Sequence, residues 1–282
     1  PEPFISQDPF LQKLKDTTPM IPTIGPADRK ELQLGLKRLK LRWIRDHLDE
    51  LSELALQEEP SYLDYLAYLV KEEVRGRDET QVRNALKAAR FPTHKSLNDF
   101  DFSFQTSVSR QTVRDLASLE FVRAHENLIL LGPPGVGKSH LAIALGIRAV
   151  EEKMRVRFWT AADLVQDLYS HLADGSLRRY IQSLTRYDLL VVDELGYLKL
   201  DQTASDHLFQ LVADAYERAS LIITSNLDFR EWAEMFANPS TAAAVLDRLL
   251  HHAHVISLKG DSYRLRSRLA PPKQTADCDK RG

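Results

Sequence analysis

The stretch Gly132-Pro133-Pro134-Gly135-Val136-Gly137-Lys138-Ser139 fits G-x-x-x-x-G-K-[ST], a pattern typical of phosphate-binding loops in nucleotide hydrolases. Residues 127–131 (NLILL) predict a short buried strand before it, and a helix is expected from His140 to Glu152 after it. In that context the loop N–H groups and the helix N-terminus face an anion. Lys138 adds a charge for the outer phosphates, and Ser139 offers a hydroxyl to Mg²⁺. The stretch therefore predicts a nucleotide site on an α/β core, with residues 132–140 in contact with the nucleotide.

A second motif, residues 188–194 (DLLVVDE), follows the same logic. An apolar strand here delivers two carboxylates at its carboxyl end, where ligands bind in open α/β sheets. We expect Asp193 to organise Mg²⁺ and its waters, and Glu194 to act as the general base that polarises the attacking water. Downstream of a phosphate-binding loop, this combination predicts hydrolysis.

A further strand is expected over residues 221–226 (LIITSN), and it ends in polar residues. Asn226 at its tip is predicted to orient the water or to contact the γ-phosphate. Another strand is expected over 155–160, with helices over 161–172, 176–187, 203–218 and 240–251. This alternation predicts a parallel sheet flanked by helices.

The composition limits the possible partners and compartments. The chain has 282 residues, of which 43% are hydrophobic, and a net charge of -2, so binding to nucleic acid would depend on local basic patches. The one cysteine, Cys278, excludes a disulfide framework. Because neither a membrane-spanning run nor a signal-type segment is seen, we expect a cytoplasmic protein.

The pattern before the core predicts a helical N-terminal domain. Residues 1–27 are rich in proline and are expected to form a flexible leader, or an arm that orders on a neighbouring subunit. Three helices are expected over 28–95: one from Asp28 to Pro60, one from Ser61 that Gly76 breaks, and one from Asp78 to Arg90. Their leucines, among them Leu63 and Leu66, are expected to point inward. An ATPase domain over 96–269 and a disordered tail over 270–282 complete the predicted organisation.

Basic residues are candidates for contact with DNA. The charge pattern equally allows a solvated surface, because acidic residues are nearly as frequent in the helical domain. The candidates are Arg38, Arg42, Arg83, Lys87, Arg90, Arg178 and Arg179.

The predicted ATPase domain begins with the aromatic stretch 97–104 (LNDFDFSF), which leads into a helix expected from Arg110 to Ala124. Its three phenylalanines are consistent either with packing beside a nucleotide base or with a place in the core.

Taken in order, these motifs resemble an AAA+ ATPase, and several separated stretches resemble more closely the IstB family of helper ATPases in insertion-sequence transposition. The resemblance covers roughly residues 28–268. The stretches are DFDFSFQ (99–105), GPPGVGKSHLAIALG (132–146), DLLVVDELGYL (188–198), IITSNLDFREW (222–232) and LDRLLHHAHVISLKGDSYR (246–264).

The resemblance implies an AAA+ core with active sites between subunits of a homo-oligomer. It matches Arg248 to the arginine that reaches a neighbour's γ-phosphate, and Arg264 to the arginine that senses nucleotide within the subunit. It implies ATP and Mg²⁺ as cofactors. The expected function is ATP-dependent assembly on duplex target DNA, held mostly through the backbone, and delivery of that DNA to a cognate transposase.

Two alternatives remain open at this point. The DnaC-type helicase loaders are sister proteins, so the chain could instead load a replicative helicase on single-stranded DNA. A scaffold that binds ATP without hydrolysing it is the other alternative, although Glu194, Asn226 and Arg248 argue against it.

Overall fold

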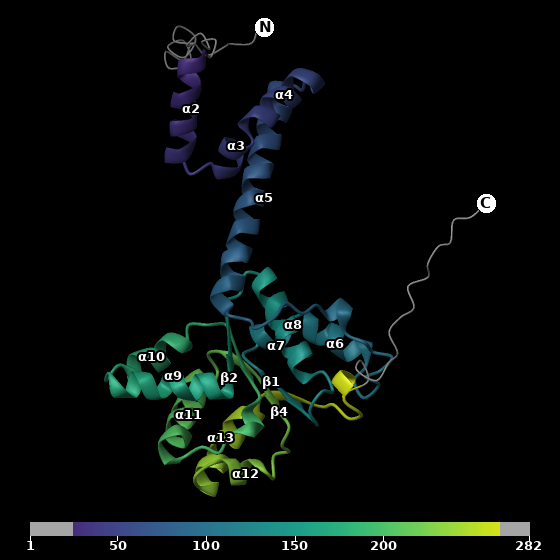
Figure 1. Cartoon of the computed structure of the whole chain (residues 1–282), viewed down its shortest axis with the longest axis vertical. Helices are drawn as coiled ribbons and strands as arrows, with labels where there is room; N and C mark the ends of the chain where they lie inside the picture. The colour runs from purple at the N-terminus through teal and green to yellow at the C-terminus, as the bar shows by residue number, and fades with distance from the viewer. Residues whose placement is uncertain (1–24, 266–282) are drawn as a thin grey trace, which may run out of the picture. The chain divides into compact units, whose positions relative to one another are not determined.

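The computed structural model describes residues 25–265, in two compact units that divide between Thr80 and Gln81 (Figure 1). The predicted leader, apart from residues 25–27, and the predicted tail with Cys278 lie outside the described residues. Residues 81–95, which the sequence pattern assigns to the helical domain, belong to the second unit. Val82, Ala85 and Leu86 pack there against the core that contains Ala89.

The first unit contains α2 (Pro26–Arg38), α3 (Arg42–Asp46), α4 (Leu48–Glu58) and most of α5 (Tyr62–Ala89). The prediction of one helix from Asp28 to Pro60 is wrong. Lys40 adopts a left-handed φ of 59°, and the N–H of Leu41 donates to the Leu36 carbonyl at 2.9 Å, which closes the end of α2. The buried Glu73 carboxylate then accepts the N–H groups of Arg42 and Ile44 at 3.1 Å each, at the start of α3.

The prediction that Gly76 breaks a helix is also wrong, because α5 runs through it for 28 residues. A Cβ at Gly76 would lie 2.7 Å from Trp43 Cδ1, so the absent side chain makes room for the indole. Packing of this kind outweighs the roughly 1 kcal/mol helix penalty of glycine. The helix ends at Ala89, one residue before the predicted end at Arg90, whose φ is 60°.

The leucines expected to point inward are largely exposed in this unit. Leu63 is 74% exposed, Leu66 56% and Val70 54%, whereas Leu36 and Leu51 are buried. The helical spacing is therefore real, but the described residues of the first unit do not cover this face of α5.

The second unit is an α/β core, as the alternation predicts. After η1 (Leu97–Asp99) and the helices α6 (Arg110–Ala117) and α7 (Glu120–Arg123), strands and helices alternate. They are β1 (Asn127–Leu131), α8 (Lys138–Glu151), β2 (Val156–Thr160), α9 (Ala161–Ala173), α10 (Leu177–Leu184), β3 (Leu189–Asp193), η2 (Leu195–Tyr197), α11 (Gln202–Ala215), β4 (Ser220–Ser225), α12 (Trp232–Met235), α13 (Pro239–His251) and β5 (Ala253–Ser257).

The five strands form one parallel sheet in the order β2-β3-β4-β1-β5. Alternate residues of β1 face opposite layers: Leu128 and Leu130 pack with α6, α7 and α8, whereas Ile129 and Leu131 pack with α9 to α13. Figure 1 shows these two helical layers on the two sides of the sheet. The predicted α/β fold with helices on both faces is confirmed, and β4 lies between β1 and β3, next to both strands that precede the nucleotide motifs.

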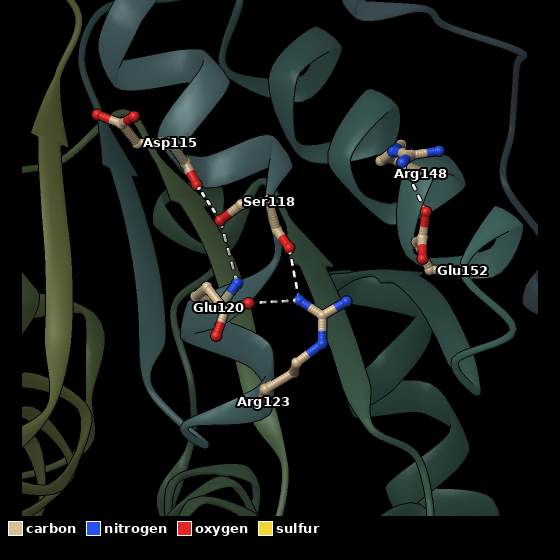
Figure 2. Close-up of polar contacts among 6 residues, drawn as sticks. All are labelled: Asp115, Ser118, Glu120, Arg123, Arg148 and Glu152. Atoms are coloured by element: carbon tan, nitrogen blue, oxygen red, sulfur yellow. Dashed lines mark hydrogen bonds and ion pairs between the residues drawn. The ribbon is translucent and has the colours of Figure 1, made fainter.

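The helix predicted from Arg110 to Ala124 is broken in two (Figure 2). Leu119, fully buried, takes a left-handed φ of 62° between α6 and α7. Ser118 Oγ donates to the Asp115 carbonyl at 2.6 Å, and Arg123 Nη1 donates to the Ser118 carbonyl at 2.6 Å and to Glu120 at 2.9 Å. These bonds satisfy carbonyls that a continuous helix would have used, while the turn places Leu119 in the core.

The helices within residues 25–265 include none that is long and apolar enough to span a membrane.

Candidate nucleotide site

The phosphate-binding loop follows β1 at the carboxyl edge of the sheet, and its glycines are required by its geometry. Gly132 has a φ of 141°, and a Cβ there would lie 2.0 Å from the Leu258 carbonyl oxygen. Gly137, at the N-cap of α8, has a φ of 106°, and a Cβ would meet the Phe100 ring at 2.7 Å. Both conformations strongly favour glycine. The loop therefore presents bare backbone at the start of α8, which suits a phosphate.

Lys138 begins α8 and turns back over the loop. Its ammonium donates to the Gly132 carbonyl at 2.6 Å and to the Pro133 carbonyl at 2.8 Å. Burial lowers the pKa of Lys138 from its usual value, while the nearby Asp193 and Glu194 carboxylates act in the opposite direction. A largely buried lysine with two carboxylates close by suits an anionic ligand with a bound cation.

Ser139, Asp193 and Thr224 meet where three elements converge. Asp193 Oδ1 accepts hydrogen bonds from Ser139 Oγ at 2.8 Å and from Thr224 Oγ1 at 2.5 Å. Mg²⁺ prefers hard oxygen ligands, and the Ser139 hydroxyl and the Asp193 carboxylate supply two such oxygens next to each other. These residues therefore fit the ion that the motifs predict. Asp193 is 6% exposed, which shields this pair from solvent.

Glu194 follows Asp193 directly and lies exposed at the mouth of the site. Its backbone is left-handed, with φ 65° and ψ 35°, and its N–H donates to Thr224 Oγ1 at 2.9 Å. Non-glycine residues in this conformation cost free energy and occur often at functional sites. The turn sends the two adjacent carboxylates in different directions.

These groups line a cavity of about 530 Å³, large enough for a nucleotide. Its wall includes the second half of the loop, Gly135 to Gly137, together with Lys138, Ser139, His140, Asp193, Glu194 and Arg264, and also Phe104, Gln105 and Tyr263. His140 Nε2 lies 2.8 Å from the Ser96 carbonyl, so this ring nitrogen donates to the backbone. The cavity thus joins the loop to the aromatic stretch before the core and to the segment after β5.

The segment after β5 is held against the loop by a backbone hydrogen bond and against the stretch before the core by a ring contact. The N–H of Tyr263 donates to the Gly135 carbonyl at 3.0 Å, and the Tyr263 and Phe104 rings contact edge to face at 5.2 Å between centroids. Arg264 follows directly and lines the cavity within its own subunit, the position that the resemblance implies.

Five of the predicted nucleotide-site residues are not among those that line this cavity: Gly132, Pro133, Pro134, Asn226 and Arg248. Asn226 lies beside Gly196, where a Cβ would approach its Oδ1 to 2.4 Å, and that buried oxygen has no hydrogen-bond partner among the described residues. Arg248 lies on α13, donates to the Ala244 carbonyl at 3.0 Å and covers the Phe209 ring at 4.8 Å. Within one subunit Arg248 is therefore separate from the nucleotide cavity.

The candidate DNA-contacting residues are all exposed: Arg38, Arg42, Arg83, Lys87, Arg90, Arg178 and Arg179. Arg83 and Lys87 are four residues apart on α5 and share a helix face, and Arg178 and Arg179 lie on α10. Burial, followed by the nearby Arg90, lowers the pKa of the Arg157 guanidinium, so two positive groups lie close together at the end of α5.

Sequence reasoning gave no role to Gln105 or to the Thr224 hydroxyl. Gln105 is 3% exposed, and its Nε2 donates to the Val136 carbonyl in the loop at 2.9 Å. Gln105 belongs to the stretch DFDFSFQ (99–105) that carries the family resemblance, and this could have indicated a role for it. The role of Thr224 depends on the order of the strands in the sheet, which no local sequence pattern indicates.

Comparison with known proteins agrees with the resemblance. The model of the family described as IstB-like ATP binding protein matches residues 34–271. The chain belongs to this family. An ATP-binding protein assigned to insertion sequence IS21 of Pseudomonas aeruginosa is 43% identical over 238 residues, 84% of this chain and 90% of the relative. A protein assigned to IS232 of Bacillus thuringiensis subsp. berliner is 37% identical over 84% of this chain and 95% of the relative.

Among solved structures, the DnaC helicase loader matches 62% of this chain and 99% of its own, with a TM-score of 0.46 and 19% identity. The AMPPCP-bound DnaA of Aquifex aeolicus matches 59% of this chain and 50% of its own, with a TM-score of 0.47 and 20% identity.

Proposed function

We propose that this protein is an ATPase that assembles on duplex DNA and supplies target DNA to a transposase. The observation that carries the proposal is the convergence of Lys138, Ser139, Asp193 and Glu194 on one cavity at the carboxyl edge of the sheet. Membership of a family of ATP-binding proteins, with relatives assigned to insertion sequences, supports the biological setting. The protein would act in the cytoplasm, where ATP and DNA are both present.

The residues of the chain divide the chemistry among them. The loop N–H groups and Lys138 bind and orient the phosphates, and Ser139 and Asp193 would hold Mg²⁺, which neutralises charge on the phosphates when bound. Glu194, exposed at the cavity mouth, accepts a proton from the attacking water at its carboxylate. Arg264 contacts the nucleotide from the segment after β5, and so links nucleotide binding to the position of that segment.

Hydrolysis would depend on assembly. Arg248 lies outside the cavity of its own subunit, on a helix face where its guanidinium is partly exposed. An arginine supplied by a neighbour can raise the rate of phosphoryl transfer by roughly 10³–10⁵ in related enzymes. Asn226 would come into contact with the water or the γ-phosphate by a small rearrangement of the turn at Gly196.

Duplex DNA would be held through its phosphates by the exposed arginines and Lys87. Such contacts position a protein without reading sequence, and they weaken steeply as salt is raised. Bending a short site costs roughly 1–6 kcal/mol, which repeated phosphate contacts along an oligomer can offset. The bent target would then be presented to the transposase.

The test is ATP turnover measured against protein concentration, with no DNA, with duplex and with single-stranded DNA of equal length. We expect the rate per subunit to rise with concentration and to rise further with duplex. A rate stimulated only by single strands would instead support a helicase loader, and background turnover in all conditions would support a scaffold that binds ATP. Co-purification of this protein with its cognate transposase tests the partner.

A further inference from the structure

We infer that Thr224 is a positioning residue for hydrolysis: its hydroxyl fixes both the Asp193 carboxylate and the backbone turn that aims Glu194. The inference rests on the proposed ATPase function and adds to it a residue that the nucleotide motifs do not include. Thr224 Oγ1 donates to Asp193 Oδ1 at 2.5 Å and accepts the N–H of Glu194 at 2.9 Å. One hydroxyl therefore serves both carboxylate residues.

Strand order puts the hydroxyl in this place. In the sheet, β4 lies between β1 and β3, with Thr224 beside Leu130 on one side and Ile223 paired with Val192 on the other. The next position along β3 is Asp193, so Thr224 lies level with the point where the two carboxylates leave the sheet. Side chains at this edge of β4 can reach both neighbouring strands.

The bonding is directional, because a hydroxyl has one hydrogen to donate. The proton of Thr224 goes to Asp193, which leaves the oxygen lone pairs for the N–H of Glu194. Asp193 Oδ1 also accepts the Ser139 hydroxyl, so one carboxylate oxygen is fixed from two sides. Thr224 is 1% exposed, so water does not readily replace it.

The bond to Glu194 stabilises an unfavourable conformation. A glutamate with left-handed backbone angles is less stable than one with ordinary angles, so the turn depends on the contacts that hold it. Without the Thr224 oxygen, the N–H of Glu194 loses its acceptor, and the left-handed conformation of Glu194 becomes less stable. The carboxylate of Glu194 would then sample directions away from the cavity.

The experiment compares Thr224→Val, which keeps the size and removes the hydroxyl, with Thr224→Ser, which keeps the hydroxyl. Ser205→Ala is the matched control, because Ser205 is also buried and its hydroxyl accepts a backbone N–H, from Ala237 at 3.0 Å, and neither residue lines the cavity. Readouts are hydrogen exchange at the Glu194 amide without nucleotide, ATP affinity, the Mg²⁺ midpoint of ATP binding, and kcat.

For Thr224→Val we expect the Glu194 amide to exchange at least about tenfold faster, and both the Mg²⁺ affinity and kcat to fall by about 10–100-fold, the range for groups that orient metal ligands. ATP affinity measured without Mg²⁺ should stay within about twofold. In Thr224→Ser the Glu194 exchange rate, the Mg²⁺ affinity and kcat should be close to those of the unaltered protein. Ser205→Ala should lower only the stability of the fold and leave these three quantities unchanged.

Two outcomes would overturn the inference. One is unchanged exchange at Glu194 in Thr224→Val; the other is an equal kcat in Thr224→Val and in the unaltered protein. If the unaltered protein does not hydrolyse ATP at all, the ATPase proposal fails, but the exchange and Mg²⁺ arms still decide whether Thr224 positions the two carboxylates.

Discussion

Replacing Gly76 by alanine should destabilise α5, although glycine to alanine normally stabilises a helix. The new Cβ would lie 2.7 Å from Trp43 Cδ1 and 3.0 Å from Trp43 Cβ and Cγ. The indole cannot withdraw easily, because it stacks on His47 at 4.4 Å between centroids. Overpacking of this kind costs about 2–3 kcal/mol, against a helix gain of about 1 kcal/mol, so we expect a net loss of about 1–2 kcal/mol.

The matched control is Gly35→Ala in α2, where a Cβ would meet nothing within 4 Å. It should stabilise its helix by about 0.5–1 kcal/mol. Native-state hydrogen exchange reads both effects locally: amides around residue 76 should exchange about 5–30-fold faster in Gly76→Ala, and those of α2 more slowly in Gly35→Ala. Slower exchange around residue 76 in Gly76→Ala would show that the contact with Trp43 does not explain the glycine.

Other predictions concern the proposed activity. Glu194→Gln should lower kcat by about 10²–10⁴-fold while ATP still binds, measured by turnover and equilibrium binding; retained turnover would remove Glu194 as the base. Arg248→Ala should be inactive alone but regain turnover when mixed with Glu194→Gln, because a mixed interface contains one complete site, and a mixture without activity would contradict an arginine supplied in trans. Charge reversal of Arg83 and Lys87 together should weaken duplex binding and reduce the salt slope by about 2 in a titration of affinity against salt. The same change at Arg148, which is not a candidate for DNA contact and pairs with Glu151 and Glu152 on its own helix, should have little effect.

The core was predictable because its signals are local. Buried parallel strands are short apolar runs, and the loop at Gly132 is punctuated by glycines whose positive φ angles allow few other residues. The helical unit was harder, because its breaks depend on contacts distant in sequence. The carboxylate of Glu73, on α5, accepts a backbone N–H at the start of α3, and the Trp43 side chain fills the space beside Gly76. No pattern in the neighbouring sequence indicates either contact.

In the candidate site, too, features with local sequence signals were predictable and features that depend on distant contacts were not. Lys138, Ser139, Asp193 and Glu194 could be named because each stands at a fixed distance from a motif. The left-handed turn at Glu194 and its bond to Thr224 could not, because they follow from the insertion of β4 between two strands that the chain makes earlier. The position of Asn226 beside Gly196, outside the cavity wall, likewise depends on tertiary packing.

The two carbonyl bonds of Lys138 have a consequence for the phosphate-binding loop. The Lys138 ammonium donates to the Gly132 and Pro133 carbonyl oxygens, and these bonds help to hold the loop in shape. An incoming triphosphate has to displace these acceptors, so part of its binding free energy is spent on the exchange. Free phosphate makes fewer contacts than a nucleotide, so its binding free energy would be too small to replace these two bonds. The site would therefore favour a complete nucleotide.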